Sequence, residues 1–208
     1  MTLLTDGKAE AKVPDGALRK VTLAMREQRQ GHAGCVIWLT GLSGAGKTTI
    51  ATELERRLFD AGFHTCLLDG DALRRGLCSD LGFDATARRE NIRRAGEVAG
   101  LFADAGAVAV CAFISPFRED RDRIRRSVAP DRFIEVFVNA PIEVCEKRDV
   151  KGFYAKARTG QIKDFTGISA PYEPPLKPEV EIRTDRLTIA ESVDTLFQHV
   201  TARNRSSG

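Results

Sequence analysis

The sequence predicts a three-layer α/β/α domain built on a five-stranded parallel sheet. Three observations predict this fold class. Five apolar, strand-like runs alternate with segments of helical periodicity, a glycine-rich loop joins the first run to the helix after it, and a capping pattern opens a closing helix. At 208 residues the chain can bury one sizeable core, so we expect one domain.

The first 31 residues are polar and of mixed charge. Pro14 and Gly16 precede a stretch, 17–28, that has the spacing of a short helix, and a disordered start is the alternative. We therefore expect an N-terminal extension over residues 1–31 and the domain itself over residues 32–204.

The first strand, a glycine loop and a helix form one continuous motif. An apolar run at 36–39 has the length of a buried strand, and Ile50, Leu54 and Leu58 recur as one helix face. Between them, residues 41–48 read GLSGAGKT and match G-x-x-x-x-G-K-[ST] at every specified position. Strand, loop and helix is the arrangement in which this motif, the P-loop, binds nucleotide phosphates, so we predict a P-loop NTPase-type fold.

The residue types of this loop suit phosphate chemistry. Glycines let backbone N–H groups close around phosphates, Lys47 can reach the β- and γ-phosphates, and the Thr48 hydroxyl can hold Mg²⁺. The helix N-terminus adds unpaired N–H groups and the positive end of a dipole. A glycine-rich turn without a ligand is the alternative. The expected ATP-binding residues of the loop are Gly41, Leu42, Ser43, Gly44, Ala45, Gly46, Lys47, Thr48 and Thr49.

The second apolar run, 65–68, leads directly into Asp69-Gly70-Asp71. Ligands of open parallel sheets collect beyond the carboxyl ends of the strands, which puts both carboxylates near the P-loop. Asp71 can accept a proton from an attacking hydroxyl or hold a metal ion through water, and Asp69 can do the latter. A pair of turn-forming Asp residues is the alternative.

The third run, 108–114, follows a predicted helix that Gly106 can end. It leads into Ser115, where many P-loop proteins carry a metal-binding Asp. Ser115 can hydrogen-bond substrate or phosphate but has no formal charge. A phosphoserine intermediate is conceivable, yet no His lies nearby in sequence, and direct in-line transfer requires no covalent enzyme species.

The runs at 133–138 and 180–182 complete the predicted sheet. Thr188 and Glu191 form a capping box ahead of the closing helix. The stretch between these two strands, about 149–178, contains several glycines and prolines and is otherwise basic and polar. We interpret it as a lid or binding loop, with a floppy surface excursion as the alternative.

A second ligand, an anionic co-substrate, is indicated by side chains near two strand ends and in the lid. Arg can clamp an anion with two hydrogen bonds, and aromatic rings can stack on a base. Singly, each of these residues is more typical of a surface charge or a core ring. The candidates are Arg74, Arg88, Asn91, Lys151 and Lys163 for the anion and Phe83 and Phe165 for the base.

Composition argues against several other classes of protein. The net charge is only +3, from 32 Lys and Arg against 29 Asp and Glu, which disfavours a dedicated nucleic-acid surface. We interpret the basic clusters at 88–89, 93–94 and 121–126 as mostly solvated helix faces, because acidic residues lie among them. No stretch approaches the roughly 20 apolar residues of a membrane span, and no signal-peptide core begins the chain.

The five cysteines contain no C-x-x-C pair, and the three histidines lack metal-ligand spacing. We expect the cysteines to be small buried hydrophobes in a reducing compartment, and no metal site beyond the Mg²⁺ that accompanies the nucleotide. The expected location is the cytoplasm.

An ordered set of motifs over roughly residues 32–200 resembles the adenylyl-sulfate kinase family. The P-loop by itself indicates only a superfamily, whereas the set, with F-I-S-P and F-T-G-I, is highly specific. The matching segments are 38–49, 68–71, 81–83, 88–94, 112–116, 145–149 and 165–168.

The resemblance implies Mg²⁺-dependent phosphorylation of the 3′-hydroxyl of adenosine 5′-phosphosulfate by ATP. It also implies a homodimer, a functional pairing with a sulfate adenylyltransferase, and Arg148 near the adenine of ATP. Two positions depart from the family pattern: Ala72 stands where Asn is usual, and Asp164 stands where a small residue is usual. The substrate residues that the resemblance implies are Asp71, Arg74, Phe83, Arg88, Asn91, Ile114, Ser115, Lys151 and Phe165.

We therefore predict Lys47, Asp71 and Ser115 as catalytic residues and Thr48 and Asp69 as the metal site. Lys47 and Mg²⁺ would neutralise the phosphates while Asp71 takes the proton. The alternatives are a kinase for another small acceptor, such as a nucleoside monophosphate, and a nucleotide-binding regulator without turnover. Nucleic-acid binding is the weakest alternative.

Overall fold

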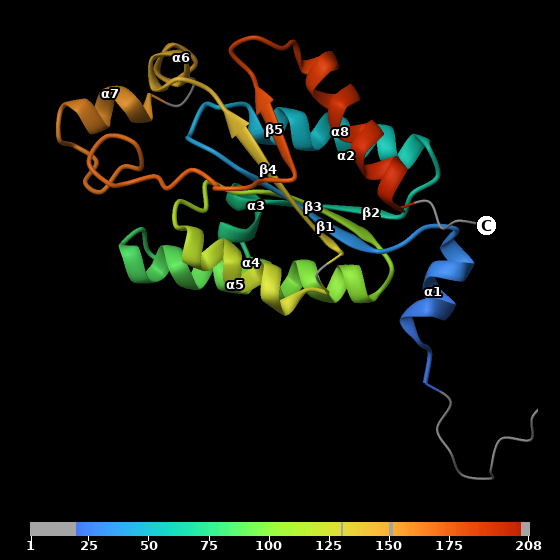
Figure 1. The fold of residues 1–208 in the computed structure, drawn as a ribbon. Coiled ribbons are helices and arrows are strands. Elements are labelled where there is room, and N and C mark those ends of the chain that lie inside the picture. The colour runs from blue at the N-terminus through green and yellow to red at the C-terminus, as the bar shows by residue number, and fades with distance from the viewer. Residues whose placement is uncertain (1–19, 130, 150–151, 205–208) are drawn as a thin grey trace, which may run out of the picture.

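A computed structural model describes residues 20–129, 131–149 and 152–204. Five strands form one parallel sheet between two layers of helices (Figure 1). The strands are β1 Cys35–Thr40, β2 Thr65–Asp69, β3 Val108–Ala112, β4 Phe133–Asn139 and β5 Val180–Arg183. The helices are α1 Leu23–Gln30, α2 Lys47–Asp60, α3 Gly70–Arg74, α4 Ala85–Asp104, α5 Arg118–Ser127, α6 Ile142–Lys147, α7 Phe153–Arg158 and α8 Ile189–Asn204.

The sheet has the strand order β2-β3-β1-β4-β5, with β1 at its centre. Ile37 of β1 pairs with Val110 on one side and with Ile134 on the other. All six residues of β1 are buried, because α2 and α8 cover one face of the sheet while α4 and α5 cover the other (Figure 1). The P-loop therefore follows directly from a fully buried strand at the centre of the sheet.

Every predicted strand is present, with ends within two residues of the prediction, and the larger differences are in the third strand and the first helix. The third strand ends at Ala112 rather than at residue 114, because the chain turns where Ser115 adopts a φ of 39°. The first helix begins at Leu23 rather than at residue 17, since the Thr22 side chain caps it, and it ends at Gln30, followed by the C-cap Gly31 with a φ of 73°. Residues 17–19 of that prediction lie outside the described residues.

Helix α1 packs across the end of the sheet opposite α6 and α7 (Figure 1). Its Glu27 accepts a hydrogen bond from the Gly34 N–H and pairs with Arg132 at 2.7 Å. Its Gln30 lies against the turn at Gly106 and contacts His64. These contacts attach the described part of the N-terminal extension to the domain, far from the P-loop.

In segment 149–178, which is called the lid segment below, the described residues make specific contacts with the rest of the domain. It contains α7, whose first N–H groups are accepted by the Asp149 carboxylate. Tyr154 and Phe165 are buried in the core, and the Glu173 N–H donates to the Pro116 carbonyl. The segment is therefore packed onto the carboxyl ends of the strands.

No helix among the described residues is long and apolar enough to cross a membrane.

Candidate active site

The P-loop connects β1 to α2 and needs glycine at positions where other residues would clash. A Cβ added to Gly41 would lie 2.3 Å from the Val138 carbonyl oxygen, and one added to Gly44 would lie 2.7 Å from the Cys145 carbonyl oxygen. Gly46 is the N-cap of α2, so no side chain caps the helix. The loop therefore leaves the first N–H groups of α2 available to an anion.

Lys47 is buried and lies over the loop. Its Nζ atom donates to the carbonyl oxygens of Gly41 at 2.9 Å and Leu42 at 2.7 Å. The ammonium group is thus held close to where the P-loop binds phosphate.

A hydroxyl and a carboxylate meet next to the loop. The Thr48 hydroxyl donates to Asp69 Oδ2 at 2.9 Å, while Asp69 Oδ1 accepts the Asp71 N–H and caps α3. A hydroxyl and a carboxylate are the hard oxygen donors that Mg²⁺ prefers, so the residues fit this ion. Asp71 lies exposed in the first turn of α3.

Two arginines predicted to bind the anionic co-substrate are anchored to the backbone around Phe83. Arg74 donates to the Gly82 carbonyl at 2.9 Å and stacks on the Phe83 ring, with 4.3 Å to its centroid. Arg88 donates to the Phe83 carbonyl at 2.7 Å and to the hydroxyl of Thr166, a lid residue, at 3.2 Å. Burial lowers the pKa of Arg88 below its ordinary value, which nevertheless leaves it a cation.

Asn91 and Ser115, two further candidates, are buried in the core. Asn91 is only 5% exposed, and its Oδ1 atom has no hydrogen-bond partner among the described residues. Such an atom is costly unless a water molecule or a ligand satisfies it. Ser115 is buried after β3, and its Oγ atom accepts the Trp38 indole N–H at 3.0 Å. Ile114, half-buried, accepts the Thr40 hydroxyl through its carbonyl.

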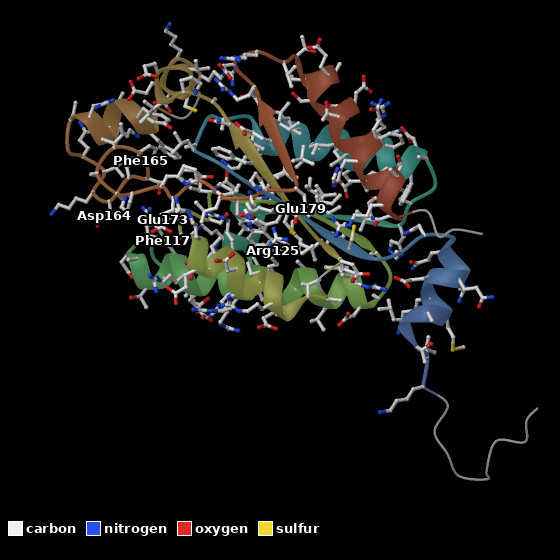
Figure 2. All side chains as sticks on the ribbon, viewed as in Figure 1. Phe117, Arg125, Asp164, Phe165, Glu173 and Glu179 are labelled. Carbon is white, nitrogen blue, oxygen red and sulfur yellow. The ribbon has the colours of Figure 1, made fainter. Side chains whose placement is uncertain are left out.

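Phe165 contacts Tyr154 edge to face, with ring centroids 4.9 Å apart. Figure 2 labels Phe165 and Asp164 in the lid segment, at the same end of the molecule as Glu173 and Phe117. The predicted Lys151 lies outside the described residues, and Lys163 is exposed.

Arg148 lies next to Thr184, which contacts the P-loop. Its guanidinium donates to the hydroxyl and the carbonyl of Thr184, and the Thr184 hydroxyl donates to the Ala45 carbonyl at 2.9 Å. Arg148 is therefore connected to the loop through Thr184. Thr184 is not among the residues that the sequence predicts for the site.

A family model for adenylylsulphate kinase matches residues 33–183. The chain belongs to the adenylyl-sulfate kinase family. A probable adenylyl-sulfate kinase of Halalkalibacterium halodurans is 54% identical over 86% of this chain and 88% of its own length. The adenylyl-sulfate kinase of Shewanella baltica strain OS155 is 55% identical over 88% of this chain and 90% of its own length.

Solved structures agree with this family. The APS kinase of Mycobacterium tuberculosis in complex with AMPPNP and APS is 43% identical, with a TM-score of 0.73 over 82% of this chain and 97% of that chain. A hexameric APS kinase from Thiobacillus denitrificans is 31% identical with a TM-score of 0.64, and the match covers 86% of this chain and 31% of that one. A gluconokinase from Sinorhizobium meliloti, at 19% identity and a TM-score of 0.54, shares the fold.

In this member of the adenylyl-sulfate kinase family, a buried ion-pair network supports the site. Arg121 is 1% exposed and donates to Glu135 of β4, to the Ser115 carbonyl and to the Glu173 carbonyl. Arg125 joins Glu135 to Glu179, which precedes β5 (Figure 2).

The interpretation of residues 121–126 as mostly solvated charges is wrong for Arg121 and Arg125, since the core needs cations opposite Glu135. The feature of the sequence that indicates a buried cation is Glu135, a lone carboxylate in an apolar run. The interpretation holds better for α4, where Arg89 and Arg93 pair with acidic residues on the surface.

All five cysteines are free thiols, and four of them are buried. Burial raises the pKa of Cys35 to about 11, so it is an inert core residue. Among the described residues, no group of three or more His, Cys, Asp or Glu side chains could hold a metal ion.

Proposed function

We propose that this protein transfers the γ-phosphoryl group of ATP to the 3′-hydroxyl of adenosine 5′-phosphosulfate, giving 3′-phosphoadenosine 5′-phosphosulfate in sulfate assimilation. The observation that carries the proposal is the contact between Thr48 and Asp69, which joins the P-loop to the acidic loop after β2. Phosphate-binding groups and a proton acceptor thus share one edge of the sheet. Family membership supports the choice of the two substrates.

On the nucleotide side, the N–H groups of residues 41–49 would surround the β- and γ-phosphates, and Lys47 would exchange its two carbonyl partners for phosphate oxygens. Thr48 would hold Mg²⁺ directly and Asp69 would hold it through water. When bound, Mg²⁺ neutralises charge that develops on the transferred group. Arg148 would border the adenine of ATP from its position beside Thr184.

On the acceptor side, Arg74 and Arg88 would hold the anionic phosphosulfate, while Phe83 and Phe165 would enclose its adenine. Asn91 would satisfy its buried Oδ1 atom with a donor of the substrate, and Ile114 would line the floor. Lys151 remains a candidate from the sequence. This set would bring the 3′-hydroxyl in line with the γ-phosphate.

Asp71 would accept the proton of the attacking 3′-hydroxyl. Ser115 would act by position, because its Oγ atom accepts the Trp38 N–H and keeps its own proton to donate toward substrate. The partner of that oxygen is a donor, so this contact does not activate the serine as a nucleophile. The proposal is direct in-line transfer without a phosphoserine.

We also propose a homodimer in the cytoplasm. The hexameric relative supports association of chains in this family, and free cysteines suit a reducing compartment. The acceptor is an adenylyl sulfate, so a sulfate adenylyltransferase would supply it.

The test is an ADP-release assay with purified protein, Mg²⁺ and ATP, in which adenylyl sulfate is compared with AMP and the product is identified by mass. We expect phosphorylated adenylyl sulfate, little reaction with AMP, and loss of turnover in Lys47→Ala. Turnover of AMP alone would identify a kinase for another acceptor. Tight ATP binding without transfer to any acceptor would identify a regulator.

A further inference from the structure

A buried tyrosine hydroxyl holds the P-loop from outside. Tyr154 is 3% exposed, and its hydroxyl donates to the Ser43 carbonyl at 2.9 Å. In a trans peptide the N–H points opposite to the C=O, so this bond turns the Gly44 N–H away from α7. Backbone N–H groups are what a P-loop offers to phosphate. The hydroxyl therefore sets the orientation of one phosphate-binding peptide unit.

The same side chain contacts the acceptor side. The rings of Tyr154 and Phe165 meet edge to face, with their centroids 4.9 Å apart and an angle of 76° between the ring planes. The Asp149 carboxylate accepts the N–H groups of Phe153 and Tyr154 and so holds the backbone that carries this ring. Burial raises the pKa of the Tyr154 hydroxyl, so it remains a protonated donor.

A second contact joins the P-loop to the lid at Gly167. A Cβ added to Gly167 would lie 2.9 Å from the Leu42 side chain, so the lid backbone rests directly on the P-loop. The two contacts involve consecutive P-loop residues, Leu42 and Ser43. A change in the conformation of the loop on phosphate binding would therefore be transmitted to the lid through both Leu42 and Ser43.

We propose that Tyr154 is a positioning residue that couples phosphate binding at the P-loop to acceptor binding at Phe165. The inference rests on the proposed assignment of residues 41–49 as the nucleotide site. Phosphate that binds the Gly44 N–H polarises the peptide and strengthens the bond from Tyr154, which orders the ring against Phe165. Coupling of this kind is reciprocal, so the acceptor changes nucleotide affinity by the same factor.

The test is calorimetric measurement of the Kd of AMPPNP with Mg²⁺, in the presence and absence of adenylyl sulfate. Tyr154→Phe removes the hydroxyl and keeps the ring. We expect this variant to bind AMPPNP about five- to tenfold more weakly, as for one lost hydrogen bond, and to show no effect of adenylyl sulfate on that Kd. A wild-type Kd that adenylyl sulfate does not change, or a wild-type-like Tyr154→Phe variant, overturns the proposal.

Tyr172→Phe is the matched control. Tyr172 is the other tyrosine of the chain and lies in the same lid segment. Its hydroxyl lies 3.0 Å from the Thr40 hydroxyl and does not contact the Ser43 carbonyl. Burial raises the pKa of Tyr172 to about 12, so it too stays protonated. We expect its AMPPNP Kd to stay within about twofold of the wild type. An equal loss in both variants would indicate a general effect on the lid and contradict the proposal.

If Tyr154→Phe does not fold, amide hydrogen exchange of the wild-type protein tests the coupling instead. We expect AMPPNP to protect amides in residues 153–166, which lie outside the nucleotide site. Unchanged protection there contradicts the coupling. If adenylyl sulfate does not bind at all, the proposed function fails, whereas the AMPPNP arm still tests the positioning of the loop by Tyr154.

Discussion

At the scale of single residues, the arginines that we propose for acceptor binding, Arg74 and Arg88, are preorganised by bonds to backbone carbonyls. Arg88 is held by the Phe83 carbonyl and the Thr166 hydroxyl, so its guanidinium is directed before any ligand arrives. Preorganised cations lose little freedom when they bind an anion.

Arg88→Ala should raise the KM for adenylyl sulfate by roughly 10- to 100-fold, because a charge-assisted contact is lost, while AMPPNP binding is kept. Steady-state kinetics and calorimetry measure the two effects. Arg89→Ala is the control, since the Arg89 side chain is 46% exposed and pairs with Glu119 on the surface. The substrate assignment would be wrong if both variants kept the wild-type KM.

Asp164 is a residue-scale feature of this chain, with a φ of 54° and a carboxylate that interacts with Arg88. Its charge favours the Arg88 cation but repels an anionic substrate. Asp164→Asn keeps the side-chain size and tolerates the left-handed backbone. We expect the KM for adenylyl sulfate to fall a few-fold and the KM for ATP to stay constant. A higher KM for adenylyl sulfate would mean that the carboxylate assists binding.

At the scale of elements, the buried arginine of α5 joins three parts of the site. Arg121 bonds Glu135 on β4, the Ser115 turn after β3 and the end of the lid at Glu173. Ser115 has a φ of 39°, so this network also stabilises a strained backbone.

Arg121→Met should destabilise the protein by about 3–5 kcal/mol, because it leaves Glu135 short of a buried partner. Urea denaturation measures this loss. Arg93→Ala, on the exposed face of α4, should cost less than about 0.5 kcal/mol. A similar small loss for Arg121→Met would show that the network contributes little to stability.

Helix α4 carries an acid-sensitive contact. Hydrogen bonds from Arg93 and Arg94 lower the pKa of Glu90 from 4.5 to about 2. A pKa that is lower in the folded state adds stability above the ordinary value of 4.5, and this contribution is lost as the pH falls toward 2. Glu90→Gln should therefore lower the urea midpoint at pH 7 but not at pH 2. An equal decrease at both pH values would exclude the ionised carboxylate as the cause.

At the scale of the whole molecule, the site lies at one end of the sheet and α1 at the other (Figure 1). The proposed homodimer predicts a mass in solution of twice the 22.8 kDa chain, and sedimentation equilibrium measures it. A single-chain mass across the concentration range would exclude the dimer.

The sequence by itself determined the sheet, the P-loop and the motifs that place the chain in its family. These features depend on patterns between neighbouring residues in the sequence. Apolar strand runs alternate with helical spacing, and the P-loop needs glycine at particular positions. The Thr188 and Glu191 capping box is a local signal of the same kind, and the structure contains its reciprocal bonds.

Tertiary structure alone decided which distant residues support the site. Tyr154 meets Ser43 across 111 positions, Thr184 meets Ala45 across 139, and Arg121 meets Glu173 across 52. Nothing in the local sequence around these side chains specifies their partners, because burial and register between strands bring them together. For the same reason the sequence did not distinguish the buried Arg121 from its solvated neighbours. Whether a single charged side chain is buried depends on how the surrounding elements pack against it.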